Sequence, residues 1–215
     1  MPDTTRSVTV VIPARFGSSR FPGKPLAMLA GKPVIQQVYE HAAMAPGVDH
    51  VLVATDDARI YETVKTFGGT AMIVDGDFRT GTDRVAAVAR QRPGQTFLNL
   101  QGDEVILHPG LLTDLIAPFL ESGAEMGTLK RRLASSEDVR NPGIVKVVTD
   151  RAGAALYFSR AMIPHVRDAR AVDVAADPYY MHLGLYIYTR QTLLRFGELP
   201  TGRLEEVEKL EQLRA

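Results

Sequence analysis

The sequence contains no cysteine among its 215 residues. Disulfide bonds, thiolate metal sites and cysteine nucleophiles are therefore excluded. An excess of one charge is also absent, because 25 lysines and arginines balance 25 aspartates and glutamates. That balance argues against a general binder of nucleic acids or membrane surfaces. A secretion signal and an apolar run of bilayer length are lacking too, so we expect a soluble cytoplasmic protein.

One stretch lacks acidic residues altogether. Between Asp3 and Glu40 there is no aspartate or glutamate. The basic residues in the same interval are Arg6, Arg15, Arg20, Lys24 and Lys32. Because the chain as a whole is neutral, this local positive charge indicates a small anionic ligand.

The loop from Pro13 to Pro25 reads P-A-R-F-G-S-S-R-F-P-G-K-P and follows the β-branched run 8–12, which predicts a buried strand. It is not a P-loop, because Lys24 is followed by Pro25, and its glycines do not form a dinucleotide fingerprint. Backbone N–H groups, arginine forks and a lysine at a strand end suit phosphate oxygens. We interpret it as a phosphate-binding loop; the alternative is a solvated basic loop.

The first half of the chain alternates between short apolar runs and helical patterns. Strands are predicted at 8–12, 50–54, 70–74 and 96–100, and helices at 33–45, 58–67 and 82–90. This alternation predicts an α/β fold, a doubly wound and mostly parallel sheet with helices on both faces. Ligands of such sheets bind beyond the carboxyl ends of the strands, where the loop 13–25 and the segment Gln101-Gly102-Asp103-Glu104 fall.

The second half predicts a smaller lobe with a mixed sheet. A helix at 109–121 precedes strands at 126–133, 144–149, 154–159 and 182–188, and 150–153 is a plausible hairpin turn. The final stretch, 203–214, predicts one amphipathic helix with Leu204, Val207, Leu210 and Leu213 in register. No linker marks a boundary, so we expect a single domain, 1–215, with a nucleotide-binding half at about 1–125 and a sugar-binding and dimerisation half at about 126–215.

Two further loops carry polar groups at predicted strand ends. Asp103 is suited to hold Mg²⁺ against phosphates, since Mg²⁺ needs only one or two protein carboxylates. The alternative is that Asp103 caps the next helix or pairs with Arg15. The loop 78–84 is able to read a base or ribose, but its spacing alone favours an ordinary helix N-terminus capped by Thr82. The remaining polar residues, taken singly, are more often structural. They are Ser159, Arg160, His182, Tyr186, Glu211 and Gln212.

Taken together, the motifs resemble those of the 3-deoxy-manno-octulosonate (Kdo) cytidylyltransferases, over nearly the whole chain and in the same order. They are I-P-A-R-F-G-S-S-R-F-P-G-K-P-L at 12–26, V-A-T-D at 53–56, T-G-T-D-R at 80–84, N-L-Q-G-D-E at 99–104, N-P-G-I-V-K-V-V at 141–148, A-L-Y-F-S-R at 155–160, H-L-G-L-Y at 182–186 and L-E-Q-L-R at 210–214. The related CMP-sialic acid synthetases typically have G-G-S-K where this chain has F-G-S-S-R.

The resemblance implies a nucleotide-diphospho-sugar transferase-like fold and a reaction in which CTP and Kdo give CMP-Kdo and pyrophosphate, for lipopolysaccharide biosynthesis. It implies Mg²⁺ as cofactor, bound by Asp103, and a homodimer. The catalytic residues would be Lys24, Arg15 and Asp103. The nucleotide would contact Ala14, Arg15, Ser18, Arg20, Lys24, Gly81, Thr82, Arg84 and Gln101. The sugar would contact Gln101, Arg160, His182, Tyr186, Glu211 and Gln212.

Two departures from the family pattern bear on these expectations. Val105 stands where the family usually has a proline after Q-G-D-E. Family members also continue past L-E-Q-L-R to a second metal-binding aspartate, whereas the printed chain ends at Ala215. The alternatives to a Kdo enzyme are therefore an enzyme that activates 8-amino-Kdo or sialic acid, and a truncated protein that binds CTP or a CMP-sugar without turnover.

Overall fold

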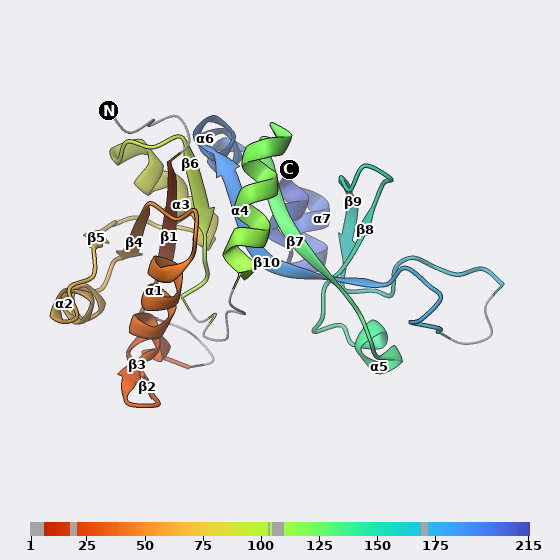
Figure 1. Ribbon diagram of the computed structural model, residues 1–215, viewed down its shortest axis with the longest axis horizontal. Helices are drawn as coiled ribbons and strands as arrows, with labels where there is room; N and C mark the ends of the chain where they lie inside the picture. The colour runs from red at the N-terminus through yellow and green to blue at the C-terminus, as the bar shows by residue number, and fades with distance from the viewer. Residues whose placement is uncertain (1–6, 18–20, 103, 105–109, 169–171) are drawn as a thin grey trace. The chain divides into compact units, whose positions relative to one another are not determined.

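The computed structural model describes residues 7–17, 21–102, 104, 110–168 and 172–215 (Figure 1). The chain divides into two compact units. Unit 1 contains Met1–Gly127 and Leu185–Glu198, and unit 2 contains Thr128–Gly184 and Leu199–Ala215. Residues 185–198 therefore belong with the first half of the chain, although they follow most of unit 2 in sequence.

The sheet of unit 1 has the strand order β5-β4-β1-β6-β10 (Figure 1). Its strands are β1 (Val8–Ala14), β4 (His50–Thr55), β5 (Ala71–Ile73), β6 (Thr96–Asn99) and the second half of β10 (Tyr180–Thr189). β1 pairs in parallel with β4 and β6, and β4 pairs in parallel with β5. β10 is antiparallel to β6. The predicted doubly wound, mostly parallel sheet is confirmed, and its strand order reverses between β1 and β6.

In the part of unit 1 that the structure describes, five α-helices accompany this sheet, and the four strands predicted in the first half are all present. The helices are α1 (Val34–Met44), α2 (Ala58–Thr66), α3 (Gly81–Gln91), α4 (Leu111–Ser122) and α6 (Arg190–Glu198). One face of the sheet packs on α3 and α6, where Val11, Leu52 and Phe97 meet Val85 and Leu193. Because side chains alternate along a strand, Val10 and Ile12 of β1 point to the other face, which α1 covers.

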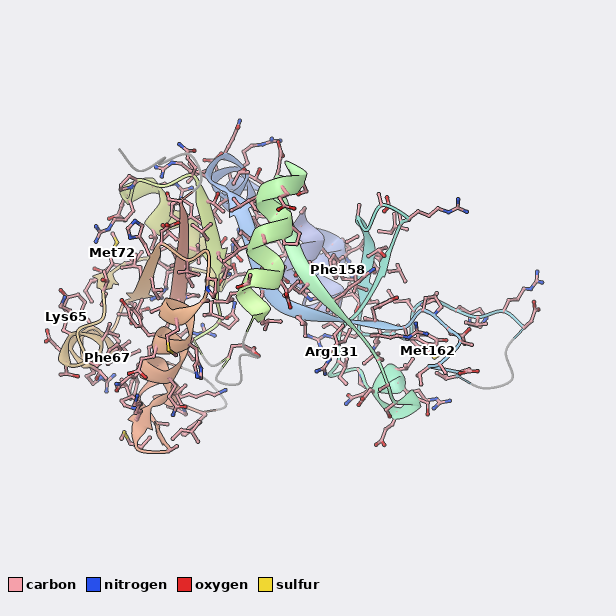
Figure 2. The ribbon with its side chains drawn as sticks, viewed as in Figure 1. Lys65, Phe67, Met72, Arg131, Phe158 and Met162 are labelled. Carbon is pink, nitrogen blue, oxygen red and sulfur yellow. The ribbon has the colours of Figure 1, made fainter. Side chains whose placement is uncertain are left out.

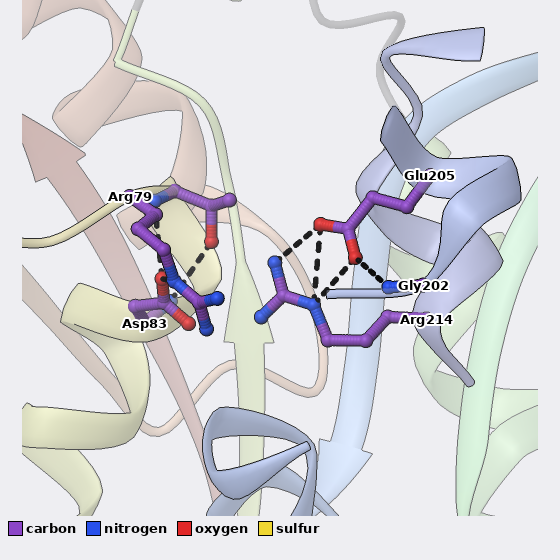
Figure 3. A network of polar contacts seen from close by, with 6 residues as sticks. Arg79, Asp83, Gly202, Glu205 and Arg214 are labelled. Atoms are coloured by element: carbon purple, nitrogen blue, oxygen red, sulfur yellow. Dashed lines mark hydrogen bonds and ion pairs between the residues drawn. The ribbon is translucent and has the colours of Figure 1, made fainter. Parts of the chain in front are cut away.

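The start of α3 differs from the prediction. The helix is capped by Thr80, not by Thr82, because the Thr80 hydroxyl accepts a hydrogen bond from the Asp83 N–H at 3.2 Å. The Asp83 carboxylate in turn accepts from the Thr80 N–H, which completes a capping box. Arg79 lies 3.6 Å from the same carboxylate (Figure 3). Thr82 is thereby displaced into the helix and is fully buried.

Unit 2 contains the hairpin that the sequence predicted. β8 (Lys146–Thr149) and β9 (Ala155–Ser159) pair antiparallel, and the turn between them is closed by a hydrogen bond from the Gly153 N–H to the Asp150 carbonyl. Val147, Phe158 and Leu210 form one small core of this unit. Unit 2 also holds most of β7 (Met126–Arg132), the first half of β10, α5 (Ser136–Arg140), α7 (Arg203–Glu208) and the 3₁₀ helix η3 (Glu211–Arg214).

The predicted single helix over 203–214 is wrong. Lys209 adopts a left-handed conformation, with φ at 54°, and divides the segment into α7 and η3. Leu204 and Val207 are more than half exposed, whereas Glu205 is buried and pairs with Arg214 (Figure 3). The buried face of α7 is therefore set by an ion pair and not by the leucine register.

Several short elements had no strong sequence pattern and were missed. They are the 3₁₀ helix η2 (Lys24–Leu26), the hairpin of β2 (Met28–Leu29) and β3 (Lys32–Pro33), α5 and α6. The predicted start of a helix at Pro109 lies outside the described residues, and α4 begins at Leu111. In the part of the chain that the structure describes, no helix has the length and apolar character needed to cross a membrane.

Candidate active site

A cavity of about 140 Å³ lies beyond the carboxyl end of β1. Its lining consists of Pro13, Ala14, Arg15, Phe78, Arg79, Thr80, Gly81, Arg84 and Gln101. These residues come from the end of β1, from the loop that leads into α3, from the first turn of α3 and from the segment after β6. The strand order reverses at this edge, which is where open α/β sheets bind ligands.

Two glycines allow these segments to approach each other. A Cβ on Gly81 would lie 3.2 Å from the Pro13 ring and 3.4 Å from the Gln101 amide nitrogen. A Cβ on Gly102 would lie 3.1 Å from the Pro13 carbonyl oxygen. Both glycines thus pack directly against the end of β1, which makes a cradle of backbone groups suited to a phosphate-bearing ligand.

Arg84 braces this cradle from within the protein. Its side chain is buried and donates to the Asp56 carboxylate at 2.7 Å and to the Ala14 carbonyl at 3.4 Å. Its guanidinium also lies 5.2 Å from the Phe78 ring centroid. The hydrogen bond and charge of Arg84 lower the pKa of the Asp56 carboxyl, so this carboxylate stays ionised near neutral pH. The ion pair with Asp56 therefore fixes the Arg84 guanidinium at the cavity wall.

Gln101 is oriented by a short chain of side-chain hydrogen bonds. Its amide N–H lies 3.5 Å from the Asn99 side-chain oxygen, and Asn99 donates to the Thr82 hydroxyl at 3.0 Å. Thr82 and Asn99 are fully buried, and Thr82 is not among the described residues that line the cavity. With one of its two amide N–H groups directed to Asn99, Gln101 keeps its carbonyl oxygen as the group able to accept from a ligand.

The phosphate loop, defined as residues 13–25, is closed at its two described ends. The Gly23 N–H donates to the Phe16 carbonyl at 2.9 Å. Lys24 follows as the first residue of η2, half-buried, and is not among the described residues that line the cavity. The predicted phosphate ligands Ser18 and Arg20 lie outside the described residues.

The predicted metal ligand Asp103 also lies outside the described residues. Within the part that is described, no group of three histidine, cysteine, aspartate or glutamate side chains is arranged to hold a metal ion. A Mg²⁺ site made by one carboxylate and completed by phosphate and water does not need such a group. Gly102, the residue before Asp103, packs on the Pro13 carbonyl at the start of the phosphate loop, which fits that kind of site.

In unit 2, a polar network surrounds His182. The ring Nε2 lies 2.9 Å from the Thr128 hydroxyl, and Nδ1 lies 3.5 Å from the Gln212 amide nitrogen. The Phe158 ring, labelled in Figure 2, meets the imidazole edge-to-face at 4.9 Å. Burial lowers the pKa of His182 to about 4, so the ring is neutral near pH 7. The Thr128 hydroxyl lies 3.1 Å from the Leu183 carbonyl, to which it donates, and it therefore accepts from Nε2. Nδ1 is left to accept from Gln212.

Arg160 lies in a second network of unit 2. Its guanidinium donates to the carbonyls of Glu208 at 2.8 Å and of Pro142 at 3.1 Å. The Glu208 carboxylate accepts from the Arg160 N–H and from the Ser159 hydroxyl. Arg160 thus ties the end of β9 to the end of α7. Part of its hydrogen-bonding capacity serves the fold of unit 2.

Lys146 completes this second network. Its side chain is fully buried, and Nζ donates to the carbonyls of Asn141 at 2.9 Å, Ile144 at 2.6 Å and Arg160 at 2.6 Å. Burial, followed by the positive charge of Arg160, lowers the pKa of the Lys146 ammonium. The three carbonyls compensate the loss of solvent around the charge.

The other sugar-site candidates are divided between the units. Tyr186 belongs to unit 1, where it pairs with Asn99 across β10 and β6 and is buried. Glu211 and Gln212 begin η3 in unit 2, with Gln212 buried and Glu211 half-buried. The structure therefore brings Ala14, Arg15, Gly81, Arg84 and Gln101 together in unit 1, and His182 and Gln212 together in unit 2.

Sequence reasoning missed two features of the cradle and one of the His182 network. Phe78, Arg79 and Thr80 line the cavity; the loop 78–84 was considered for a base or ribose, but only Gly81, Thr82 and Arg84 of it were among the predicted ligands. Asp56 was not among the predicted site residues, and its pairing with buried Arg84 had no sequence signal beyond its place after a strand. Thr128, next to His182, is a single threonine on a predicted strand and gave no signal.

A second cavity, of about 460 Å³, lies at the opposite edge of the unit 1 sheet. Thr9 and His50, at the amino-terminal ends of β1 and β4, belong to its lining. Ligands of open α/β sheets bind at the carboxyl ends of the strands. The larger cavity therefore does not displace the cradle as the candidate active site.

The doubly wound sheet, with its glycine-lined and arginine-lined cradle at the switch point, defines a nucleotide-binding α/β protein. Residues 9–215 match the family model described as cytidylyltransferase. The chain is 51% identical over 214 residues to a 3-deoxy-manno-octulosonate cytidylyltransferase of Syntrophotalea carbinolica, with 97% of this chain and 86% of that protein covered. The chain belongs to the cytidylyltransferase family, whose members are nucleotidyltransferases.

A solved structure and a further relative are also similar to nearly the whole chain. A solved structure of CMP:2-keto-3-deoxy-manno-octonic acid synthetase complexed with CTP has a TM-score of 0.90 and 41% identity, covering 97% of this chain and 84% of that one. An 8-amino-3,8-dideoxy-manno-octulosonate cytidylyltransferase of Shewanella loihica is 46% identical over 214 residues, covering 97% of this chain and 85% of that protein. The family resemblance seen in the motifs is thereby confirmed.

Proposed function

We propose that the protein is a 3-deoxy-manno-octulosonate cytidylyltransferase, which couples CTP and Kdo to give CMP-Kdo and pyrophosphate for lipopolysaccharide biosynthesis. The observation that carries the proposal is the cradle at the carboxyl end of β1, where Arg15, Arg84 and two glycines converge. The similarity to relatives that carry this name, and to a structure complexed with CTP, supports it.

In this reaction the anomeric hydroxyl oxygen of Kdo attacks the α-phosphorus of CTP. A new P–O bond forms, the bond from the α-phosphorus to the bridging oxygen breaks, and pyrophosphate leaves with the electron pair while the hydroxyl loses its proton. Negative charge spreads over phosphate oxygens, so positioning and electrostatic stabilisation supply most of the catalysis. A protein nucleophile is not required.

The residues of unit 1 would hold the nucleotide. Arg15 and Lys24, with Ser18 and Arg20, would bind the triphosphate, and Lys24 would neutralise charge on the leaving pyrophosphate. The cytidine would lie against Gly81, whose backbone packs on Pro13, while buried Arg84 keeps that wall in place. The residues that would contact the nucleotide in full are Ala14, Arg15, Ser18, Arg20, Lys24, Gly81, Thr82, Arg84 and Gln101.

The acceptor sugar would bind to polar groups that the structure already orients. Gln101 would accept from a sugar hydroxyl with its carbonyl oxygen, since its nitrogen is held by Asn99. In unit 2, neutral His182 directs the Gln212 amide nitrogen toward its own Nδ1, which leaves the Gln212 oxygen as an acceptor. Tyr186, Arg160 and Glu211 complete the proposed set.

Asp103 would hold Mg²⁺ beside the phosphates. When bound, Mg²⁺ supplies charge neutralisation at the phosphate oxygens and lowers the pKa of the attacking hydroxyl. We further propose that the enzyme acts in the cytoplasm as a homodimer, with Kdo and CTP as its small-molecule substrates.

A pyrophosphate-release assay with CTP and Mg²⁺ tests the proposal. Kdo, 8-amino-Kdo and sialic acid are supplied in parallel, and Kdo is expected to give the highest kcat/KM. A preference for 8-amino-Kdo would favour the alternative suggested by the Shewanella relative. Silence with all three sugars, together with measurable CTP binding, would replace the enzyme by a CTP-binding protein.

The same assay tests the site with a control that the sequence itself provides. Lys24 and Lys32 each stand in a Gly-Lys-Pro tripeptide, but Lys32 is half exposed and its ammonium lies 2.6 Å from Glu40. Asp103→Ala is expected to abolish turnover, and Lys24→Ala to lower kcat/KM for CTP by about 10²-fold. Lys32→Ala should leave it unchanged. Equal effects of the two lysine substitutions would count against the assignment of Lys24.

A further inference from the structure

The turn after β4 contains two adjacent aspartates, and each holds one arginine. Asp56 pairs with Arg84, as described above. Asp57 accepts from Arg59 through both of its oxygens, at 3.0 Å from Nε and 2.6 Å from Nη2. One of these oxygens also accepts from the Arg59 N–H at 2.9 Å and caps α2. Asp57 therefore holds the guanidinium fork of Arg59 in a bidentate ion pair at the first turn of the helix.

The flat face of that fork lies on the Phe16 ring. The guanidinium carbon of Arg59 is 3.4 Å from the ring centroid, which is stacking contact. The hydrogen bonds of Arg59 to Asp57 lower the pKa of the Asp57 carboxyl, so the ion pair that holds the fork persists near neutral pH. Asp57 compensates the charge of Arg59. Arg59 contacts the phosphate loop through the flat face of its guanidinium, which stacks on Phe16.

Phe16 connects the two described ends of that loop. Its carbonyl accepts from the Gly23 N–H at 2.9 Å, and its ring lies so close to Gly23 that a Cβ there would be 2.9 Å from a ring carbon. Gly23 has a φ of 73° and directly precedes Lys24. The Phe16 ring thus holds the segment that follows β1 against Gly23, where the chain returns to Lys24.

We propose that Arg59 is a positioning residue for CTP, which acts by clamping the Phe16 ring and so holding the two described ends of the phosphate loop, Phe16 and Gly23-Lys24, ready for the triphosphate. The proposal rests on the proposed function only in taking CTP as the ligand of the loop. Arg59 does not contact the nucleotide in this scheme. Its contribution is to order the two described ends of the loop before CTP binds. Without this contact the ordering would take place on binding and would lower the affinity for CTP.

The test is a double-mutant cycle on Arg59 and Phe16, measured by calorimetric titration with CTP and Mg²⁺. Arg59→Met keeps the length of the side chain but removes the planar cation, and Phe16→Leu keeps an apolar group but removes the ring. Each is expected to raise the Kd for CTP about fivefold. The Kd of the double variant for CTP should not exceed the higher of the two Kd values of the single variants, because both substitutions remove the same contact.

A matched control comes from the same helix. Lys65 is an exposed cation in the last turn of α2 and is labelled in Figure 2. Lys65→Met removes the same charge from α2 and should leave the Kd for CTP unchanged. In steady-state assays, Arg59→Met should raise KM for CTP by the same factor as Kd, while kcat and the KM for Kdo stay within about twofold of the parent. Arg59→Lys, which retains a cation but not the fork, should lie between the parent and Arg59→Met.

Three results would overturn the proposal. One is an unchanged Kd in Arg59→Met. Another is a full additional loss when Arg59→Met is combined with Phe16→Leu, which would mean that Arg59 acts on the nucleotide directly. The third is a loss in Lys65→Met equal to that in Arg59→Met. If Arg59→Met does not fold, Asp57→Asn releases the same fork and should weaken CTP binding as well. Absence of turnover in the parent protein would overturn the proposed function alone, since the titration needs no turnover, whereas absence of CTP binding would overturn both.

Discussion

His182 shows how burial alone changes the chemistry of one residue. The side chain is buried beside Phe158 and the neutral polar groups of Thr128 and Gln212, and burial is the cause of its shifted pKa. Loss of solvent disfavours the imidazolium and lowers the pKa from 6.5 to about 4. The ring is therefore a hydrogen-bonding group of fixed tautomer, not a proton carrier, near pH 7.

The shifted pKa predicts a pH dependence of stability. Between pH 6.5 and 4 the unfolded chain binds a proton at His182 and the folded chain does not, so the free energy of unfolding falls as the pH is lowered through this range. The expected loss is about 3 kcal/mol, measured by urea unfolding at several pH values.

Two histidine substitutions isolate this contribution from that of the carboxylates. His182→Gln should flatten the pH dependence by about that amount, whereas His165→Gln, at an exposed position of the same unit, should not change it. If the free energy of unfolding fell equally with pH in the parent and in His182→Gln, the histidine would have to protonate in the folded state.

For single residues, the sequence predicted which side chains line the cavity better than it predicted which side chains they contact. Ala14, Arg15, Gly81 and Gln101 were assigned to one ligand by the resemblance of their motifs to the family, and the structure places them around one cavity. The pairing of Asp56 with Arg84 is separated by 28 residues, and its existence depends on the exact distance between two loops. Hydrophobic periodicity does not encode such distances, so the bracing contacts were not predictable.

At the scale of elements, the C-terminal segment is held by a buried ion pair. Arg214 donates to Glu205 through Nε at 2.9 Å and through Nη2 at 2.5 Å, and both side chains are at least nine-tenths buried (Figure 3). Glu205 also accepts from the Gly202 N–H at the start of α7. The pair therefore joins α7 to η3, which carries Glu211 and Gln212.

Breaking this pair should be strongly destabilising. Glu205→Gln leaves the Arg214 charge buried without its partner and is expected to lower the free energy of unfolding by about 3 kcal/mol. Glu205→Leu combined with Arg214→Met should lose less than the sum of the single changes, since no lone charge remains. Arg203→Met, which removes an exposed pair with Glu206, should change stability by less than about 0.5 kcal/mol. Thermal and urea unfolding of these variants, and of Glu205→Leu and Arg214→Met alone, measure these differences, and equal losses in Glu205→Gln and Arg203→Met would contradict the assignment.

The same segment explains where element prediction failed. The leucine register over 203–214 favoured one helix, yet the ion pair and the left-handed Lys209 divide it. A burial pattern set by Glu205 is invisible to a count of apolar residues. By contrast, the strands and helices of the first half were predicted closely, because buried parallel strands are apolar throughout and their helices are amphipathic.

At the scale of the whole molecule, charge is balanced although the cradle is basic. The formal net charge is zero and the isoelectric point is about 7.0. Solubility should therefore be lowest near pH 7 and rise on either side, because repulsion between copies is weakest at zero net charge. Precipitation midpoints in polyethylene glycol at pH 6, 7 and 8.5 measure this, and a monotonic change across the series would contradict it.

The division into units also has a consequence for biosynthesis. The core of unit 1 includes Tyr186, Tyr188 and Leu193, which the ribosome makes only after all of 128–184. During synthesis, the sheet of unit 1 remains without its β10 edge and without α6 until residue 198 has emerged. The nascent nucleotide-binding unit must therefore wait, with the apolar face of α3 incompletely covered, while most of unit 2 is translated.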